Sequence, residues 1–249
     1  MSVRSDLFLD IGNTRIKWGY RNPDARGWIT GNCAYDEFIG LQWSFEINRL
    51  MVACVRDQAD LSKQLQSHFA ERLYWLSTPL ADHPQFQHCY VDATRLGVDR
   101  WLAMLGARQL HRDNLLVVDA GTALTLDLLD QNQQHRGGWI VPGLQLAQQA
   151  LFQQTQRVNP YQDEDDASHA GPGQDTLSCV SSGVKRQLLT LVLSVMADYP
   201  DYKVFVCGGD GAWLTHELEL SGMADVEIHY APHLIFDGME SLCAGSFLL

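Results

Sequence analysis

The chain has 249 residues, of which 46% are hydrophobic and 19% charged, and its formal net charge is −12 at pH 7. This composition is typical of a globular protein with a substantial core and excludes a chain that is disordered throughout. Proteins that bind nucleic acids usually carry a stripe of basic residues that neutralises phosphates, and the 18 basic residues of this chain form no such stripe. The negative net charge also argues against docking on an anionic membrane.

No targeting or membrane-spanning segment stands out. The apolar run Leu7–Leu9 is broken by Asp10, whereas a signal peptide needs about 7–15 apolar residues and a membrane span about 18. The six cysteines are too widely spaced for a zinc site, so we expect reduced, mostly buried thiols in a cytoplasmic protein. His83, His88 and Cys89 come nearest to a metal-binding cluster, but no second ligand pair accompanies them.

The predicted elements alternate between strands and helices. In chain order they are a strand–turn–strand pattern at 7–20, strands at 50–55 and 73–77, a helix at 97–110, a second strand–turn–strand pattern at 115–128, a helix at 184–197 and a strand at 203–207. The acidic stretch 158–176 is expected to be a solvated loop. This alternation indicates an α/β architecture.

One pattern occurs twice. Residues 7–20 (LFLDIGNTRIKWGY) and 115–128 (LLVVDAGTALTLDL) each contain an apolar run, an aspartate, a glycine two positions later, a small polar residue and a second run of mixed character. Similarity at a fixed offset indicates a duplicated unit, and the period is too long for a solenoid. We therefore expect two similar halves around a shared cleft. The alternative is two ordinary hairpins that share only Asp-x-Gly turn chemistry.

Each copy of the pattern carries groups that suit an anion. Gly12 and Gly121 permit tight reversals, and a turn of this kind directs several backbone N–H groups towards one point. Thr14 and Thr122 add hydroxyl donors. The aspartate of each copy ends its first strand beside the same point, where a divalent ion can bridge carboxylate and phosphate.

The two hairpins resemble the phosphate-binding hairpins of the acetate and sugar kinase, Hsp70 and actin superfamily. Three further segments narrow the resemblance: GVDRW at 97–101, GGWIVPG at 137–143 and DTLSCVSSGV at 175–184. Together the ordered motifs are similar to type III pantothenate kinase, and they span nearly the whole chain. The resemblance implies an α/β protein of actin-like ATPase (ribonuclease H-like) architecture. Its two duplicated halves have mixed sheets flanked by helices, with the active site in the cleft between them.

The same resemblance implies the domains and the reaction. Residues 1–112 would hold the first phosphate loop and the catalytic aspartate, and residues 113–249 the second phosphate loop and the adenosine-side glycines Gly208 and Gly209. The implied reaction is in-line transfer of a phosphoryl group from ATP to pantothenate, which yields 4′-phosphopantothenate in the first step of coenzyme A biosynthesis. The implied cofactors are Mg²⁺ with ATP and a monovalent cation, K⁺ or NH₄⁺, and the implied partner is a second copy in a homodimer.

The resemblance also assigns roles to individual residues. The positions that match ATP-binding residues are Asp10, Ile11, Gly12, Asn13, Thr14, Arg15, Ile16, Lys17, Gly121 and Thr122. The positions that match substrate-binding residues are Tyr90, Gly97, Val98, Asp99, Arg100 and Thr176. Asp99 matches the catalytic base, Asp119 the ligand of the monovalent cation, and Asp10 a ligand of Mg²⁺ through water.

Local physical chemistry leaves other interpretations of these residues open. At a helix start the macrodipole favours an ionised Asp99 that can accept a hydroxyl proton, but aspartate is also a common helix N-cap. Lys17 would also fit the exposed side of an alternating strand, and Tyr90 would fit a core or rim position. Thr176 would also fit a cap of the helix that follows it.

Two other functions stay open. One is a related superfamily kinase that acts on another small hydroxyl or carboxylate substrate, and the other is a non-enzymatic accessory regulator. A regulator need not keep Asp99, Thr14 and Thr122 together, and this chain has all three. Because the chain is acidic, positive potential for two anionic substrates must come from turn N–H groups, bound cations, Lys17 and Arg100.

Overall fold

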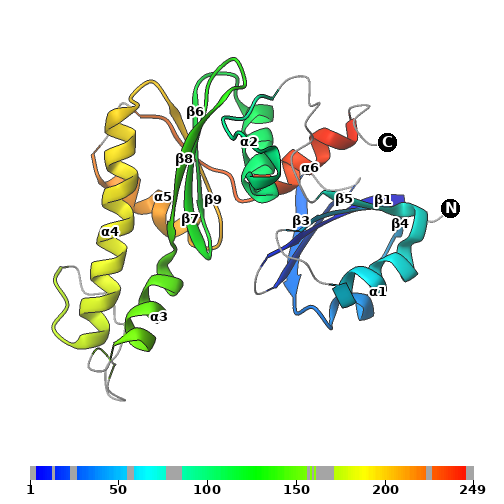
Figure 1. Ribbon diagram of the computed structural model, residues 1–249, viewed down its shortest axis with the longest axis horizontal. Coiled ribbons are helices and arrows are strands. Elements are labelled where there is room, and N and C mark those ends of the chain that lie inside the picture. The colour runs from blue at the N-terminus through cyan, green and yellow to red at the C-terminus, as the bar shows by residue number, and fades with distance from the viewer. Residues whose placement is uncertain are drawn as a thin grey trace. The chain divides into compact units, whose positions relative to one another are not determined.

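The computed structural model (Figure 1) describes residues 4–12, 15–22, 27–54, 59–76, 86–155, 158, 160, 171–222 and 226–244. The strands are β1 (Arg4–Ile11), β2 (Ile16–Arg21), β3 (Trp28–Cys33), β4 (Glu46–Cys54), β5 (Leu73–Leu76), β6 (Leu115–Ala120), β7 (Ala123–Leu129), β8 (His135–Pro142), β9 (Lys203–Cys207) and β10 (Ile228–Tyr230). The α-helices are α1 (Ala59–Phe69), α2 (Val98–Leu110), α3 (Leu144–Gln154), α4 (Thr176–Asp198), α5 (Gly211–Leu220) and α6 (Leu234–Ala244).

The strands form two five-stranded mixed sheets with the same topology. The first sheet has the order β3-β2-β1-β4-β5, and the second, read from its other edge, has the order β8-β7-β6-β9-β10. In each sheet the first three strands pair antiparallel and the last three pair parallel. This correspondence confirms the duplicated α/β unit that the sequence repeat predicts.

The helices follow the same repeat. α1 connects the parallel strands β4 and β5, and α5 connects β9 and β10 in the same place. α2 follows β5 as α6 follows β10, so α2 and α6 are the equivalent helices of the two copies. The copies differ mainly between the third and fourth equivalent strands, where the second copy carries α3 and α4.

The first core lies on one face of the first sheet. In β1, Leu7, Leu9 and Ile11 point into this core, as the two-residue period of a strand requires. The residues between them, Phe8 and Asp10, therefore lie on the opposite face. The Phe8 ring contacts Trp28 at 5.2 Å, and Trp28 contacts Phe236 of α6 at 5.4 Å between centroids, so α6 covers that opposite face.

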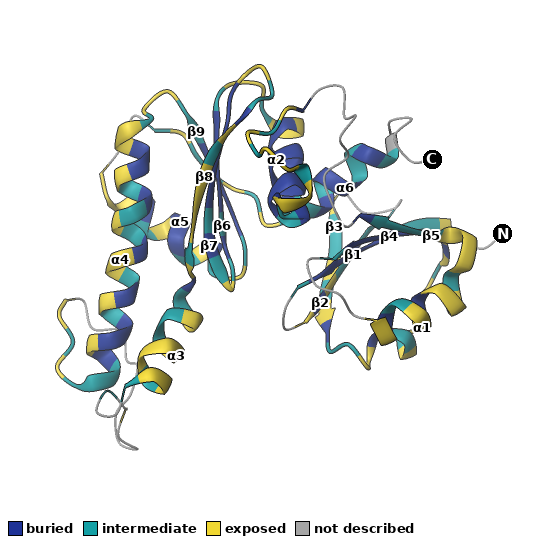
Figure 2. Ribbon diagram, in the orientation of Figure 1, coloured by how far each residue is buried: buried dark blue, intermediate teal, exposed yellow. Residues whose placement is uncertain are grey.

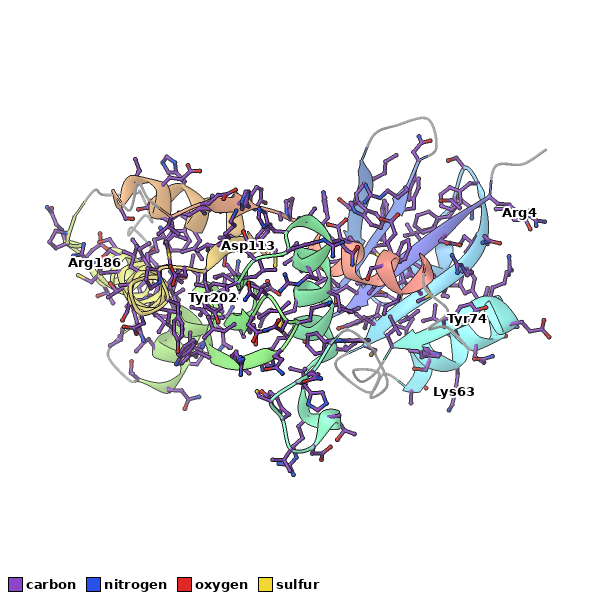
Figure 3. The ribbon with its side chains drawn as sticks, turned by 90° about the horizontal axis from the view of Figure 1, so that it is seen from above. Arg4, Lys63, Tyr74, Asp113, Arg186 and Tyr202 are labelled. Atoms are coloured by element: carbon purple, nitrogen blue, oxygen red, sulfur yellow. The ribbon has the colours of Figure 1, made fainter. Side chains whose placement is uncertain are left out.

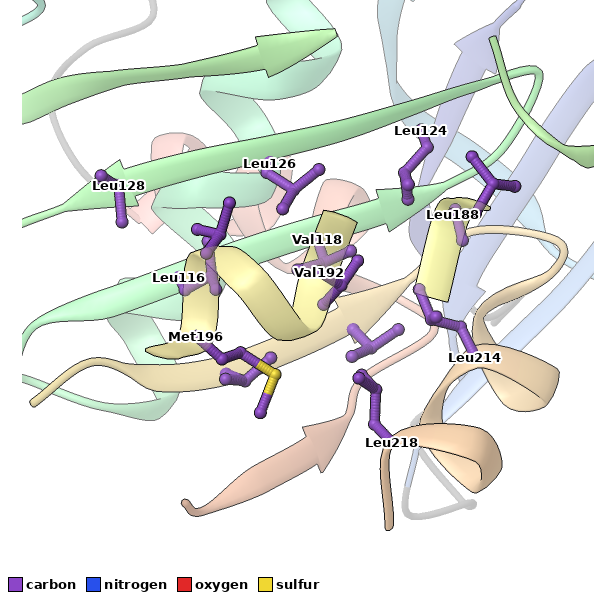
Figure 4. Packing of buried hydrophobic residues seen from close by; sticks show 14 of the residues in the cluster. Leu116, Val118, Leu124, Leu126, Leu128, Leu188, Val192, Met196, Leu214 and Leu218 are labelled. Carbon is purple, nitrogen blue, oxygen red and sulfur yellow. The ribbon is translucent and has the colours of Figure 1, made fainter. Parts of the chain in front are cut away.

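The second core forms between the second sheet and two helices (Figure 4). Side chains of β6 and β7 meet one face of α4 and one face of α5 there; they include Leu116, Val118, Leu124, Leu126, Leu128, Leu188, Val192, Met196, Leu214 and Leu218. Buried and exposed positions alternate along α4 (Figure 2). Arg186 of α4 and Lys63 of α1 lie on exposed helix faces (Figure 3).

Two compact units emerge from the contacts: residues up to Leu110 together with those from His233 onward, and His111–Pro232. The expected division into 1–112 and 113–249 places α6 with the second half, as the repeat does. By contacts α6 belongs with the first unit, because it packs against α2. A Cβ atom at Gly106 would lie 2.0 Å from the Leu234 carbonyl oxygen, and one at Gly238 would lie 2.1 Å from that of Leu102.

The structure lengthens one predicted helix and contradicts the expected burial of the cysteines. The predicted helix at 184–197 is α4, which begins eight residues earlier because Asp175 caps it. Most of the expected loop 158–176 lies outside the described residues. The expectation of mostly buried thiols is wrong: only Cys33 and Cys207 are buried, whereas Cys89 and Cys179 are exposed on irregular or helix-surface positions. Among the described residues, no helix is long and apolar enough to cross a membrane.

Candidate active site

The first hairpin forms a tight loop directly after Asp10. The Gly12 N–H donates to the Arg15 carbonyl oxygen at 3.2 Å, which closes the reversal between β1 and β2. Asn13 and Thr14 lie outside the described residues. The side chains of Ile11 and Ile16 are fully buried in the first core, so a ligand at this loop can meet only their backbone. Arg15 is exposed at the loop.

Asp10 is a buried carboxylate. It is 6% exposed, and burial raises its pKa to about 6, an effect that Lys17 opposes and Asp99 reinforces. Lys17 lies directly across the β1–β2 register, with its Nζ 3.9 Å from Asp10 Oδ2, and its side chain is 52% exposed. Lys17 is therefore both the exposed strand residue and the neighbour of Asp10. The charge of Asp99 contributes to the raised pKa of Asp10, but its effect is smaller than those of burial and of Lys17.

Asp99 lies in the first turn of α2 but does not cap it. The Gly97 carbonyl oxygen accepts the Trp101 N–H at 3.1 Å, so Gly97 occupies the capping position. The Asp99 carboxylate accepts the Arg100 N–H at 2.8 Å, and its Oδ1 would lie 2.5 Å from a Cβ at position 97. The interpretation of Asp99 as a plain N-cap is thus wrong. Its carboxylate lies against the N-terminus of α2, where it accepts a backbone N–H.

Two expected substrate residues lie in direct contact. The Arg100 guanidinium donates from Nη1 to the Tyr90 hydroxyl oxygen at 2.8 Å, and its Cζ lies 5.9 Å from the centre of the Tyr90 ring. Arg100 is 7% exposed and Tyr90 is half-buried. Both residues, with Gly97 and the buried Val98, lie at the N-terminal end of α2 beside Asp99.

The second hairpin loop is held from two sides. The Gly121 N–H donates to the Ala123 carbonyl oxygen at 3.1 Å, and the Gly143 N–H donates to the Thr122 carbonyl oxygen at 2.9 Å. A Cβ at Gly143 would lie 2.1 Å from the Gly121 carbonyl oxygen, so only glycine allows this approach. The GGWIVPG segment therefore supports the second loop. The side chain of Thr122 is exposed above that loop.

Asp119 lies beside the glycine pair that follows β9. Gly208 has φ +90°, and a Cβ there would lie 2.4 Å from both Asp119 Oδ1 and the Ala120 carbonyl oxygen. Space at Gly209 is open, with nothing within 4 Å of a Cβ. The Asp210 N–H donates to the Ala120 carbonyl oxygen at 2.9 Å, and burial raises the pKa of the Asp210 carboxyl.

Thr176 is the first residue of α4, and it is not its cap. Asp175 is the N-cap, and its carboxylate accepts the Ser178 N–H at 2.7 Å in a capping box. The expected alternative role of Thr176 as the helix cap is therefore wrong. Thr176 lies half-buried immediately after the cap.

The described residues fit oxygen-bound cations at two places, although they contain no group of three or more His, Cys, Asp or Glu side chains that could hold a metal. Asp10 carries a burial cost that Lys17 offsets only in part, so a divalent cation beside it would favour its charged form. Asp119 Oδ1 and the Ala120 carbonyl oxygen both lie close to Gly208, and the Ala120 carbonyl also accepts the Asp210 N–H, so Asp119 is the carboxylate oxygen donor at the second place.

The weak metal-binding candidates of the sequence do not form a cluster among the described residues, and one contact at the first loop was not expected. His83 lies outside the described residues, His88 Nδ1 contacts the Tyr90 carbonyl oxygen at 3.0 Å, and Cys89 is exposed. Sequence reasoning missed Tyr35, whose hydroxyl donates to the Gly12 carbonyl oxygen at 2.5 Å. No local pattern marks Tyr35, because its contact joins positions 23 residues apart.

Comparison with known proteins finds matches along most of the chain. A family model described as type III pantothenate kinase matches residues 6–198. A type III pantothenate kinase of Alcanivorax borkumensis is 30% identical over 256 residues and covers 96% of this chain and 98% of the relative. That of Teredinibacter turnerae is 32% identical over 255 residues and covers 94% and 96%.

The fold is also shared with a solved structure. The ethanolamine utilization protein EutJ from Carboxydothermus hydrogenoformans has a TM-score of 0.55 at 14% identity, with 97% of this chain and 90% of that protein covered. At this identity the likeness concerns the fold alone. The matched model and the full-length relatives, together with the paired hairpins and the aspartate at the start of α2, show that the chain belongs to the type III pantothenate kinase family.

Proposed function

We propose that this chain phosphorylates pantothenate with ATP to give 4′-phosphopantothenate, the first step of coenzyme A biosynthesis, and that Asp99 is the general base. Besides family membership, one observation supports the proposal: the Asp99 carboxylate lies in the first turn of α2, where it accepts the Arg100 N–H at 2.8 Å, and the Arg100 side chain in turn contacts Tyr90. Phosphoryl transfer depends on positioning and charge neutralisation, and a carboxylate at the start of α2 can serve as the proton acceptor for the attacking hydroxyl.

The nucleotide is assigned to the two hairpin loops. Residues 10–17 supply backbone N–H groups and Lys17, and Asp10 holds Mg²⁺ through water. Bound Mg²⁺ neutralises phosphate charge. Gly121 and the exposed hydroxyl of Thr122 supply donors from the second loop, and Gly208 with Gly209 contacts the adenosine side. The open space at Gly209 supports that last role, because a flat group can approach its backbone.

Pantothenate is assigned to the N-terminal end of α2. Arg100 supplies positive charge for an anionic substrate, and its hydrogen bond to Tyr90 holds the guanidinium in one orientation. Gly97 and Val98 contribute through their backbone next to Asp99, because the Val98 side chain is buried, and Thr176 contributes a hydroxyl donor. The ionised Asp99 accepts the proton of the attacking primary hydroxyl during in-line transfer.

Two finer features complete the proposal. Asp119 holds the monovalent cation, K⁺ or NH₄⁺. The protein forms a homodimer through β8 and α3. β8 is an edge strand with Ile140 59% exposed, and α3 has no buried residue and exposes Leu146. Such a surface favours association with a second copy.

A coupled assay of ATP consumption tests the function. We expect turnover that requires pantothenate. ATP consumption at the same rate without pantothenate would be transfer to water, and no consumption under either condition would mean that pantothenate is not the acceptor; either result would contradict the proposed reaction. With K⁺ or NH₄⁺ in place of Na⁺ the rate should rise. Equal rates in Na⁺, K⁺ and a bulky organic cation would contradict the assignment of Asp119.

Variants of two aspartates at matching helix positions test whether Asp99 is the general base. Asp99→Asn should lower kcat by about 10²–10⁴-fold, which is the range for loss of a general base. ATP binding should stay intact. Asp60 occupies the same second position in α1 and is exposed, so Asp60→Asn is the control and should retain full activity. Turnover of Asp99→Asn close to that of Asp60→Asn would remove Asp99 from the mechanism.

A further inference from the structure

Tyr35 contacts the first hairpin loop from outside it. Its hydroxyl donates to the Gly12 carbonyl oxygen at 2.5 Å, although Tyr35 follows β3 and Gly12 follows β1. We propose that Tyr35 is a positioning residue for the nucleotide, which holds the first phosphate loop in the orientation that receives the ATP phosphates. This inference rests on the proposed function and names a residue that the family motifs leave out.

The ring of Tyr35 is anchored before its hydroxyl reaches the loop. Tyr35 is half-buried and packs against the first core, whose members include Ile11 and Ile16 on either side of the loop. A ring fixed by packing loses little rotamer freedom when its hydroxyl forms a hydrogen bond. The packing of the ring therefore helps to hold the hydroxyl at the loop.

The turn that carries Tyr35 is itself closed. The Glu37 N–H donates to the Ala34 carbonyl oxygen at 3.3 Å, and the Ala34 N–H donates to Glu37 Oε2 at 2.8 Å. These two reciprocal bonds join the residues on either side of Tyr35. The backbone that presents the phenol is thus braced independently of the loop that the phenol contacts.

The hydrogen bond from Tyr35 engages the carbonyl group of Gly12, at the start of the loop. Gly12 already donates its N–H to the Arg15 carbonyl, so the contact with Tyr35 engages the remaining backbone polar group of Gly12. A peptide unit is planar, so a hydrogen bond to the Gly12 carbonyl oxygen restrains the peptide plane to which that oxygen belongs. Phosphate binding by a loop depends on the directions of its peptide dipoles. Tyr35 therefore acts on the nucleotide through the loop and does not touch the phosphates.

Removal of a single hydroxyl tests this role. Tyr35→Phe keeps the ring and should raise the KM for ATP by about 2- to 10-fold, the range for loss of one neutral hydrogen bond, with the KM for pantothenate unchanged. Tyr20→Phe is the matched control. Tyr20 lies in the aromatic cluster of the same sheet, beside Trp18 and Phe45, and no hydrogen bond of its hydroxyl is found among the described residues. This variant should leave both KM values unchanged.

The outcomes separate this proposal from the proposed function. KM does not depend on the fraction of folded enzyme, so lower stability of Tyr35→Phe cannot imitate the expected change. An unchanged KM for ATP, or an equal rise in both KM values, would overturn the role of Tyr35 and leave the kinase assignment intact. A wild-type protein without pantothenate-dependent ATP consumption would overturn the kinase assignment, and the positioning role with it.

Discussion

Asp10 shows at the scale of one residue how folding and function oppose each other. Burial raises its pKa from 3.8 to about 6, so the folded chain binds this proton more tightly than the unfolded chain does. Asp10 therefore makes the fold less stable as the pH rises from about 4 through about 6, and the cost is fully present above that range. A carboxylate kept in such a place is better explained by cation binding than by stability.

The variant Asp10→Asn should separate the cost of Asp10 to stability from its role in activity. At pH 8 it should melt at a higher temperature than the wild type, because a neutral amide avoids a desolvation cost of about 3 kcal/mol, and this advantage should vanish near pH 4. Its kinase activity should be lost. Calorimetric melts at both pH values and a rate assay check this. A lower melting temperature at pH 8 would show that the carboxylate stabilises the unliganded fold.

Thr176 and its neighbour divide the capping and binding roles. Asp175→Ala should lower the free energy of unfolding by about 1 kcal/mol, because Asp175 caps α4. Thr176→Val should instead weaken pantothenate binding by about 2- to 10-fold at unchanged melting temperature and unchanged ATP affinity. Calorimetric titration beside thermal melts measures both. Unchanged pantothenate affinity in Thr176→Val would remove Thr176 from the substrate site.

At the scale of elements, the pairing of α2 with α6 depends on two glycines. Gly106 of α2 meets the Leu234 carbonyl, and Gly238 of α6 meets the Leu102 carbonyl, at close range in both directions. The glycine stands four residues after the contacted leucine on each helix, so the equivalent helices of the repeat contact each other reciprocally. Because Val98 and Asp99 are the first residues of α2, this packing helps to place the proposed base.

Gly238→Ala should destabilise the fold, because the added methyl meets backbone that has no free rotamer to move away. A loss of about 1–3 kcal/mol is expected, as for an overpacked core. Gly183→Ala is the matched control: Gly183 is an exposed glycine within α4 with nothing within 4 Å of a Cβ, and alanine there should stabilise by about 0.5–1 kcal/mol. Denaturant unfolding measures both. Equal effects would show that α6 shifts easily on α2.

At the scale of the whole molecule, the proposed homodimer depends on an exposed edge. Ile140→Glu on β8 should shift the protein from dimer to a 28.0 kDa monomer, because a charge on an apolar interface is costly to bury. Leu220 at the end of α5 is 69% exposed, and Leu220→Glu should leave the dimer unchanged. Light scattering after size exclusion measures the mass. Two variants of identical mass would exclude this edge as the interface.

Local patterns in the sequence determined the repeated hairpins, α2 and β9, because strand alternation, Asp-x-Gly reversals and helical spacing depend on neighbours along the chain. The ordered motifs also determined the family. Edge strands β3, β8 and β10 carry weaker local signals, and no prediction covered them. The start of α4 was missed because its capping box lies in a polar segment.

Only the tertiary structure decided which distant groups meet. It placed α6 with α2, the Tyr90 hydroxyl on Arg100, the Tyr35 hydroxyl on Gly12, and Gly143 against the second loop. It also decided the pKa of Asp10, since burial depends on what packs above a strand and not on the residues beside it in the chain. The sequence determined which residue types are available for phosphoryl transfer; long-range packing decided their distances, their exposure and their charge.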